Sequence, residues 1–186
     1  MSSDFRVHLA TRELRAGGVI AYPTEGVWGL GCDPNDAAAV LRLLMLKQRD
    51  MAKGLLLVAA DIEQLAPYLI GLSPSQQQRL RDSWPAPLTW LVPNNGAAPD
   101  WICGDHPGVA LRVSAHPLVA ALCRAFGGPL VSTSANPSGR PAALTALRVR
   151  HYFGDDLDFI VHGELGGQRG PTPIRDLITD KWVRGR

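Results

Sequence analysis

Hydrophobic positions along the chain switch repeatedly between helical spacing and short continuous apolar runs. Helical patterns cover residues 4–16, a segment from Asn35 or Asp36 to about Lys47, a segment that starts at Ser73-Pro74, and residues 117–126 and 145–153. Apolar runs predict strands at 19–22, 55–58, 88–92, 109–113, 130–132 and 159–161, and residues 173–183 have an extended pattern. Helices and strands that alternate in this way are typical of an α/β domain.

The order of these elements predicts a single-domain α/β fold over residues 4–186, with a twisted mixed sheet flanked by helices. A chain of 186 residues is long enough for one domain with a substantial core. We find no internal repeat, no low-complexity segment and no Ser/Gly linker in the sequence. Hairpin-like spacings and helical crossovers both occur, so we expect antiparallel and parallel strand pairs in one sheet.

Composition narrows the functional classes. Lys and Arg number 19 and Asp and Glu 17, and the resulting net charge of +2 is too small to indicate a nucleic-acid binder by bulk charge alone. The three cysteines lie far apart without a Cys-x-x-Cys pair, so we expect neither a disulfide framework nor a zinc ribbon. The sequence shows no apolar run of membrane-spanning length and no secretory leader pattern, so we expect a cytoplasmic protein with no membrane partner.

Three segments contain residues suited to chemistry, and the first is YPTEGVWGLGCD at 22–33, directly after a predicted strand. Its three glycines allow a ligand to approach the backbone closely, and Thr24 and Glu25 add hydrogen-bonding groups. The glycine spacing matches neither a Walker A loop nor a dinucleotide fingerprint. The alternative interpretation is a glycine-rich connection whose Trp28 packs on the core.

The second segment, 47–54, lies between the end of a predicted helix and a predicted strand. Lys47, Arg49 and Lys53 bring three positive charges into seven residues. A favourable interaction with the helix dipole explains Lys47 but not the two charges that follow. The alternative interpretation of the whole segment is a run of charges exposed to solvent. Ligands of α/β proteins bind beside strand ends, and converging cations there suit a polyphosphate.

The third segment is VSTSANPSG at 131–139, which follows a predicted buried strand and offers four hydroxyl groups and an amide. Such residues form anion-binding nests, although they also favour simple Asx or Ser turns. Without a Gly-x-Ser-x-Gly elbow, we do not expect a serine nucleophile. Arg112 lies in the apolar strand 109–113, where it needs a ligand carboxylate or phosphate, or an internal salt bridge to an Asp.

The remaining candidates carry weaker signals. Cys103 and His106 have a Cys-x-x-His spacing, but no second pair completes a zinc site, so no protein metal site is predicted. His116 precedes a proline and is a candidate helix cap, and the adjacent Arg175 and Asp176 suggest a structural ion pair.

Together these segments resemble the motifs of the YrdC-type threonylcarbamoyl-AMP synthase family, in its short bacterial form. The motifs follow the family's order over essentially the whole chain: YPTE at 22–25 with GLG at 29–31, Lys47-x-Arg49 with Lys53, WPAPLT at 84–89, Arg112, STSAN at 132–136, and Pro171-Thr172. The chain departs from the family pattern at Trp28, where many members have Tyr, and at Ala86, where Gly is usual.

The resemblance implies a YrdC-like fold and a nucleotidyltransferase activity. In that family L-threonine and bicarbonate or CO2 form a carbamate, which attacks the α-phosphate of ATP to give threonylcarbamoyl-AMP and pyrophosphate. The product serves the modification of an adenosine next to the anticodon of tRNA. The partners implied are ATP, L-threonine, bicarbonate, tRNA and the proteins that transfer the threonylcarbamoyl group.

The resemblance also implies roles for particular residues. Lys47, Arg49 and Lys53 are expected to be catalytic and to hold the triphosphate of ATP. The expected ATP-binding residues on the third segment are Ser132, Ser134 and Asn136, and the expected threonine-binding residues are Thr24 and Arg112. Catalysis is then positioning and electrostatic stabilisation, and Mg²⁺ binds through the ATP phosphates because no carboxylate cage is visible.

Two other functions remain open. An RNA-binding module for tRNA or rRNA, without catalysis, would account for the basic end of the chain, Lys181, Arg184 and Arg186, and would bind RNA in a salt-sensitive way without ATP. A carbamoyl-adenylate-forming domain, of the kind found in hydrogenase maturation proteins, would use carbamoyl phosphate and ignore threonine.

Overall fold

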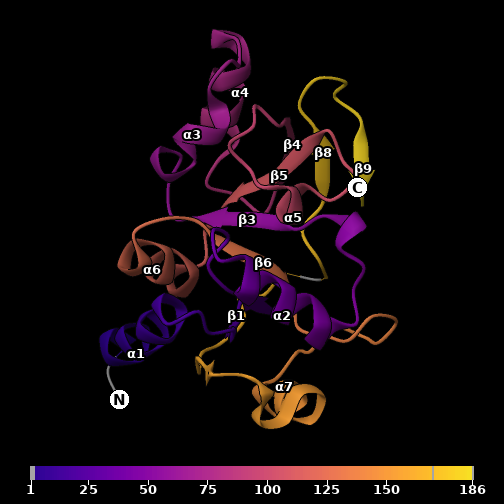
Figure 1. Ribbon diagram of the computed structural model, residues 1–186. Helices are drawn as coiled ribbons and strands as arrows, with labels where there is room; N and C mark the ends of the chain where they lie inside the picture. Colours follow the sequence, from indigo (N-terminus) through magenta and orange to yellow (C-terminus); the bar gives the residue numbers. More distant parts are fainter. Residues whose placement is uncertain (1–2, 169, 186) are drawn as a thin grey trace.

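The computed structural model describes residues 3–168 and 170–185. Within these ranges one mixed sheet has nine strands (Figure 1). In sheet order they are β7 (Phe159–Ile160), β1 (Ile20–Pro23), β2 (Trp28–Gly31), β6 (Leu130–Ser134), β3 (Leu56–Ala59), β5 (Gly108–Val113), β4 (Thr89–Pro93), β8 (Ile174–Asp176) and β9 (Trp182–Arg184). The neighbours β1–β7, β3–β5 and β4–β8 are parallel and the other pairs are antiparallel, so the predicted mixed sheet is confirmed.

Helices cover both faces of this sheet. They are α1 (Ser3–Arg15), α2 (Ala37–Lys47), α3 (Ala66–Leu69), α4 (Pro74–Ser83), α5 (Asp100–Cys103), α6 (Pro117–Phe126) and α7 (Ala146–Phe153), with short 3₁₀ turns η1 (Met51–Lys53), η2 (Glu63–Leu65) and η3 (Gly154–Asp156). No helix in the described part of the chain is long and apolar enough to cross a membrane.

Local sequence explains where the longer helices begin and end. The Asp36 side chain accepts hydrogen bonds from the first backbone N–H groups of α2, and Ser73 and Gln76 form a capping box at the start of α4. Helix α2 ends at Lys47, and its C-cap Gln48 has a left-handed backbone conformation with φ of 50°. This sharp end directs Arg49 and the following residues away from the helix axis.

The strands separate two hydrophobic cores because successive side chains point to opposite faces of the sheet. Leu57 belongs to the core that includes α2 and α4, whereas its neighbour Val58 belongs to the core under α1 and α6. Helices α1 and α6 lie side by side in Figure 1. The residues adjacent to Leu57 in β3 and to Leu111 in β5 therefore point to the face of the sheet that α1 and α6 cover.

The structure adds a strand that the sequence did not predict. Residues Trp28–Gly31 form β2, which pairs with β1 so that Tyr22 lies opposite Gly29. A Cβ atom on Gly31 would lie 2.5 Å from the Val131 carbonyl oxygen, so this glycine permits close approach of two strands. Part of the glycine-rich segment is thus sheet, and Trp28 is buried in the core, as the alternative interpretation of that segment held.

Candidate functional site

A cavity of about 280 Å³ lies against the sheet on the face that also carries α1 and α6. Its lining comes from strands in the middle and at the C-terminal edge of the sheet, and from the segment 49–56. Six of the eight predicted site residues are among the lining residues: Thr24, Arg49, Lys53, Arg112, Ser132 and Ser134. Residues far apart in the sequence are therefore brought to one place.

Four cationic side chains line this cavity: Arg49, Lys53, Arg112 and Arg184. Arg49 donates to the carbonyl of Gly54 at 2.9 Å, and burial lowers the pKa of its guanidinium. The pKa of Arg184 is also lowered, first by burial and then by the charges of Arg112 and Arg49. No carboxylate belongs to the described lining, so the cavity is electropositive and suited to an anion.

Arg112 is held from two sides. Its Nη1 donates to the Thr172 hydroxyl and lies 3.4 Å from Glu25 Oε2. Ser114 donates to the other oxygen of the same carboxylate at 2.6 Å. Burial alone would raise the pKa of Glu25, but Arg112 and the Ser114 hydroxyl lower it below its usual range. The internal salt bridge considered for Arg112 exists, with a glutamate in place of the expected Asp, and Arg112 still reaches the cavity.

Strand β6 supplies the hydroxyl groups. Ser132 and Ser134 are two residues apart, so their side chains share a face of the sheet, and both line the cavity. Thr24 also lines the cavity, and its hydroxyl donates to the Val27 carbonyl at 2.7 Å. The hydroxyl oxygen of Thr24 retains capacity to accept a hydrogen bond from a ligand.

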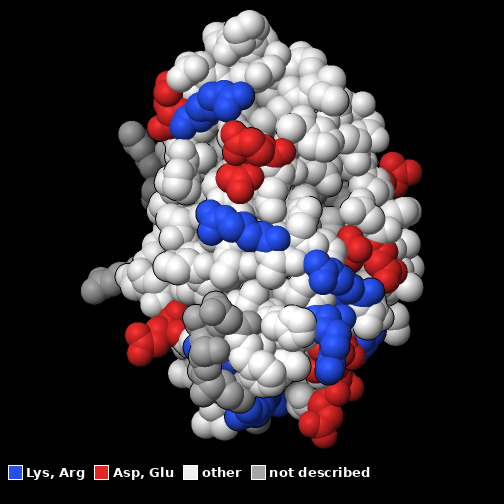
Figure 2. Space-filling view, turned by 90° about the vertical axis from the view of Figure 1, so that its left-hand side faces the viewer, with Lys and Arg blue, Asp and Glu red and all other residues white. Residues whose placement is uncertain are grey.

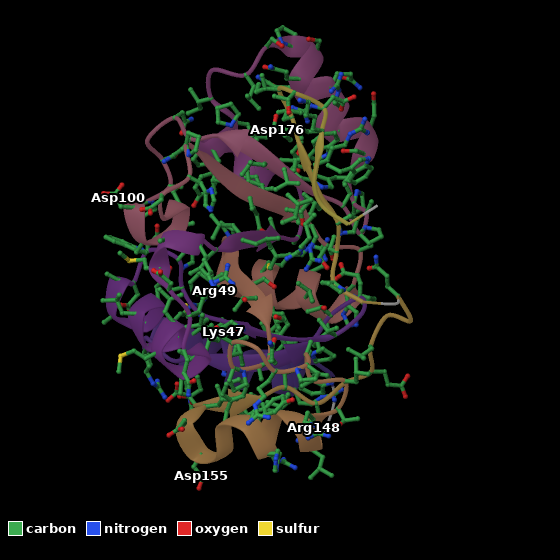
Figure 3. All side chains as sticks on the ribbon, turned by 90° about the vertical axis from the view of Figure 1, so that its right-hand side faces the viewer. Lys47, Arg49, Asp100, Arg148, Asp155 and Asp176 are labelled. Carbon is green, nitrogen blue, oxygen red and sulfur yellow. The ribbon has the colours of Figure 1, made fainter. Side chains whose placement is uncertain are left out.

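Lys47 does not line the cavity. Its buried ammonium donates to the carbonyls of Ser134 and Asn136, and its own carbonyl accepts from the Ser138 N–H at 2.7 Å. Burial and the charge of Arg49 lower the pKa of Lys47 to about 7. Figure 3 shows Lys47 and Arg49 close together near the centre of the molecule. In this structure Lys47 fastens the end of α2 to the segment 134–138, rather than presenting its charge to the cavity.

Asn136 is also outside the cavity lining. Its amide donates to the carbonyl of Pro137 at 3.1 Å and to that of Arg140 at 2.7 Å. These bonds fix the turn after β6. They are not those of an Asx turn, because Asn136 Oδ1 accepts no hydrogen bond within the described ranges. The residues predicted in this segment therefore have two roles. Ser132 and Ser134 face the cavity, and Asn136 fixes the loop after β6.

Some contributing residues were not among the predicted site residues. Arg184 lies on β9 and lines the cavity, but from the sequence it was considered only as part of a basic end that would bind RNA. Thr172 was visible in the Pro171-Thr172 motif, and Glu25 in the YPTE motif, without an assigned role. One lesser prediction was wrong, because Arg175 pairs with Asp180 at 2.7 Å instead of with Asp176. His116 is the N-cap residue of α6, as suggested, although its side chain makes no capping hydrogen bond.

The described residues contain no group of three or more His, Cys, Asp or Glu side chains arranged to hold a metal ion. Cys103 and His106 both line the cavity, and Cys103 is a free thiol. The lining therefore offers positive charge, hydroxyl groups, one thiol and one imidazole.

The family model for Sua5, YciO and YrdC proteins, described as "Telomere recombination", matches residues 12–186. A protein of Cellvibrio japonicus named threonylcarbamoyl-AMP synthase is 56% identical over 96% of this chain and 95% of its own length. A protein of Stutzerimonas stutzeri with the same name is 56% identical over 99% of both chains.

Among solved structures, P. abyssi Sua5 complexed with L-threonine superposes with a TM-score of 0.88 at 29% identity. The match covers 94% of this chain and 52% of the Sua5 chain, so the chain spans about half the length of that protein. The family match over residues 12–186 and the two relatives at 56% identity lead to one conclusion: the chain belongs to the Sua5/YciO/YrdC family.

Proposed function

We propose that the chain synthesises threonylcarbamoyl-AMP and pyrophosphate from L-threonine, bicarbonate or CO2, and ATP, for the modification of tRNA next to the anticodon. The observation that carries this proposal is the cavity, in which four cations and two strand serines converge without a carboxylate in the described lining. Two relatives that match nearly the whole chain bear the name of this activity.

The roles proposed for the lining residues follow from charge. Arg49 and Lys53 lie together on the segment after α2 and would hold the triphosphate, with Ser132 and Ser134 donating to phosphate oxygens. Arg112 and Thr24 would hold the carboxylate and the hydroxyl group of threonine. Threonine in the P. abyssi Sua5 structure supports the choice of amino acid.

The proposed reaction requires no protein nucleophile. The threonine amine attacks the carbon of bicarbonate, and loss of water leaves a carbamate. A carbamate oxygen then attacks the α-phosphorus of ATP, the bond to the β-phosphate oxygen breaks, and pyrophosphate leaves. Negative charge grows on the leaving group and on the equatorial oxygens, so fixed cations stabilise the transition state.

Lys47 and Asn136 enter this scheme differently from the other residues. Both act on the segment 134–138, so we propose that they support ATP binding by fixing the loop beside Ser134. Mg²⁺ would arrive on the ATP phosphates as part of the substrate, because the cavity offers hydroxyls and cations but no carboxylate in its described lining.

The position of Arg184 weighs against the RNA-binding alternative. This residue was part of the basic end that favoured RNA, and it lines the same cavity as Arg112. The proposal includes delivery of the product to tRNA through transfer proteins. The first step of that sequence, synthesis of the adenylate, would take place in the cavity.

The test is direct detection of the product. The purified chain is incubated with ATP, Mg²⁺, L-threonine and ¹³C-bicarbonate, and the adenylate is identified by mass spectrometry with the isotope in its carbamoyl carbon. Replacing threonine and bicarbonate with carbamoyl phosphate tests the carbamoyl-adenylate alternative. The proposal fails if the labelled adenylate does not form, or if carbamoyl phosphate gives a product that needs no threonine.

A further inference from the structure

Strand β9 contributes Arg184 to the cavity although it lies at the edge of the sheet. Within the described residues its one neighbouring strand is β8 (Figure 1). The other two residues of β9, Trp182 and Val183, are 41% and 57% exposed. Burial in a core therefore does not hold β9 in place, and side-chain contacts must add to its backbone bonds with β8.

The pairing of β9 with β8 changes register by one residue. Ile174 lies opposite Arg184. The next residue of β8, Arg175, lies opposite Trp182, so Val183 is an extra residue on β9. A bulge of this kind alters the face of the sheet to which the following side chain points. Ile174 and Arg184 both line the cavity, so the direction of Arg184 depends on where Trp182 pairs.

Arg175 lies between two aromatic residues on the other face of the sheet. It is opposite Trp90 of β4 and opposite Trp182 of β9, so the three side chains form one row across three strands. The guanidinium carbon of Arg175 is 5.6 Å from the centre of the Trp90 ring and 5.2 Å from that of the Trp182 ring. Both distances are typical of cation–π contacts. Trp90 belongs to the core that includes α2 and α4, so this row connects β9 to that core.

The same arginine also fixes the turn between β8 and β9. Arg175 Nη2 lies 2.7 Å from Asp180 Oδ2, and Arg175 Nε donates to the Asp180 carbonyl at 3.1 Å. Arg79 of α4 lies 3.1 Å from the other carboxylate oxygen of Asp180. Trp90 donates from its indole nitrogen to the Ser83 hydroxyl of α4 at 2.8 Å. Arg175 therefore joins the β8–β9 turn, strand β9 and a buried ring that α4 holds.

On the cavity face, Arg184 lies beside Arg112. Arg184 Nη2 donates to the Thr172 carbonyl at 2.7 Å, and the hydroxyl of the same threonine accepts a hydrogen bond from Arg112. A shift of β9 would therefore remove one of two neighbouring cations from the cavity. On the face of the molecule in Figure 2, by contrast, basic side chains are interspersed with acidic ones. An anion is thus expected to bind in the cavity, where its affinity depends on the position of Arg184.

We propose that Arg175 is a positioning residue for ligand binding: its contacts with Trp90 and Trp182 fix the register of β9 and so direct Arg184 into the cavity. Arg175 does not line the cavity, so it acts through Arg184. The assignment rests on the proposed function in taking ATP and L-threonine as the ligands. The position of β9 itself does not depend on the reaction.

The test measures the position of β9 and the affinity of the cavity separately. Hydrogen exchange, followed by NMR of ¹⁵N-labelled protein, reports on the amides of residues 182–184 that bond to β8, with the amides of β5 as the reference for the whole fold. Calorimetry measures the binding of ATP and of L-threonine without turnover. Arg175→Met removes the cation and its ion pair, whereas the control Arg79→Met removes the other arginine of Asp180 and leaves the row intact.

Arg175→Met should speed exchange in β9 at least about tenfold relative to β5 and weaken binding of one ligand about fivefold, and Arg79→Met should do neither. The weakened ligand should be the one that Arg184→Gln also weakens. In the Arg184→Gln background, Arg175→Met should have no further effect on binding, because it acts through Arg184. Trp182→Leu should reproduce Arg175→Met, which keeps the test open if that variant does not fold.

The assignment is overturned if exchange in β9 is unchanged in Arg175→Met, or if Arg175→Met and Arg184→Gln weaken binding independently. It is also overturned if Arg184→Gln changes neither affinity. A native protein that binds both ligands but forms no adenylate would contradict the proposed function and leave this assignment intact. A native protein that binds neither ligand would overturn both.

Discussion

The carboxylate of Glu25 and the guanidinium of Arg112 form a buried ion pair, with 3.4 Å between Oε2 and Nη1. The pair joins the segment after β1 to the end of β5, and Ser114 and Thr172 fix its two partners by hydrogen bonds. Arg112 lines the cavity, whereas Glu25 is not among the described lining residues. The orientation of the cationic group in the cavity therefore depends on a residue outside it.

Glu25→Gln should destabilise the fold by about 3 kcal/mol at neutral pH, because it leaves the charge of Arg112 buried and unpaired. The pKa of Glu25 is below its usual range, so its contribution is present above the unfolded pKa and is lost as pH falls through the folded value. Urea unfolding of both proteins from neutral to acidic pH measures this difference.

The matched control is Glu63→Gln, since Glu63 is exposed and its nearest cation, Arg81, is 3.9 Å away. It should change stability by less than about 0.5 kcal/mol. A Glu25→Gln effect that stays constant into acid would contradict the assignment of the ion pair.

Lys47 should give stability a pH dependence of the same sign as Glu25, but in a higher pH window. Its folded pKa of about 7 lies below the value of about 10.4 for an unfolded lysine, so the unfolded chain binds the proton more tightly in that window. The stability of the native protein relative to Lys47→Met should rise with pH, by an amount on the order of 2 kcal/mol between about pH 7 and pH 10. Chemical unfolding across this range measures it.

Lys181→Met is the control for that experiment, because Lys181 is exposed. It should show no comparable slope relative to the native protein. If the stability difference between the native protein and Lys47→Met also does not change with pH, Lys47 is not held in the buried position described.

Much of the fold follows from local sequence. Ser73-Pro74 and the pair Asn35-Asp36 marked helix starts that the structure confirms, with Asp36 as the cap, and continuous apolar runs identified β3 and β5. Strand β2 was not predicted because its Trp-Gly-Leu-Gly sequence has the composition of a loop. It becomes a strand through tertiary pairing with β1 and β6, which a local pattern does not contain.

The site shows the same division. Residue type and spacing identified Arg112, Arg49 and the serines of β6, because a charge in an apolar strand and hydroxyls at a strand end are unusual. The direction of a side chain is set by packing, so the sequence could not separate Lys47, which points into the protein, from Arg49, two residues later. Likewise, only the pairing of β8 with β9 brings Arg184 to the cavity.

Gly31→Ala should lower the free energy of unfolding by about 2–4 kcal/mol, since the new Cβ would meet the Val131 carbonyl oxygen at 2.5 Å and the Tyr22 ring at 2.8 Å. Gly128→Ala is the matched control, because nothing lies within 4 Å of its Cβ position. In thermal unfolding, the stability of Gly128→Ala should be close to that of the native protein. Equal effects of the two substitutions would contradict the close packing of β2 on β6.

Arg184→Gln should weaken ATP or threonine binding about tenfold, because it removes one of the converging cations of the cavity. Lys181→Gln, which removes an exposed charge nearby in the sequence, should leave KM for both substrates unchanged. Steady-state kinetics on both variants separates them. If RNA affinity falls equally in the two variants while KM does not change, the basic end serves RNA instead.

The central claim is an adenylation reaction that requires both threonine and bicarbonate. Pyrophosphate release is measured with ATP and Mg²⁺ present, while threonine and bicarbonate are omitted in turn from CO2-depleted buffer. We predict release only with both, and a drop of at least about tenfold for Arg112→Ala. Release that needs neither substrate, or no release together with no binding of ATP, would contradict the account.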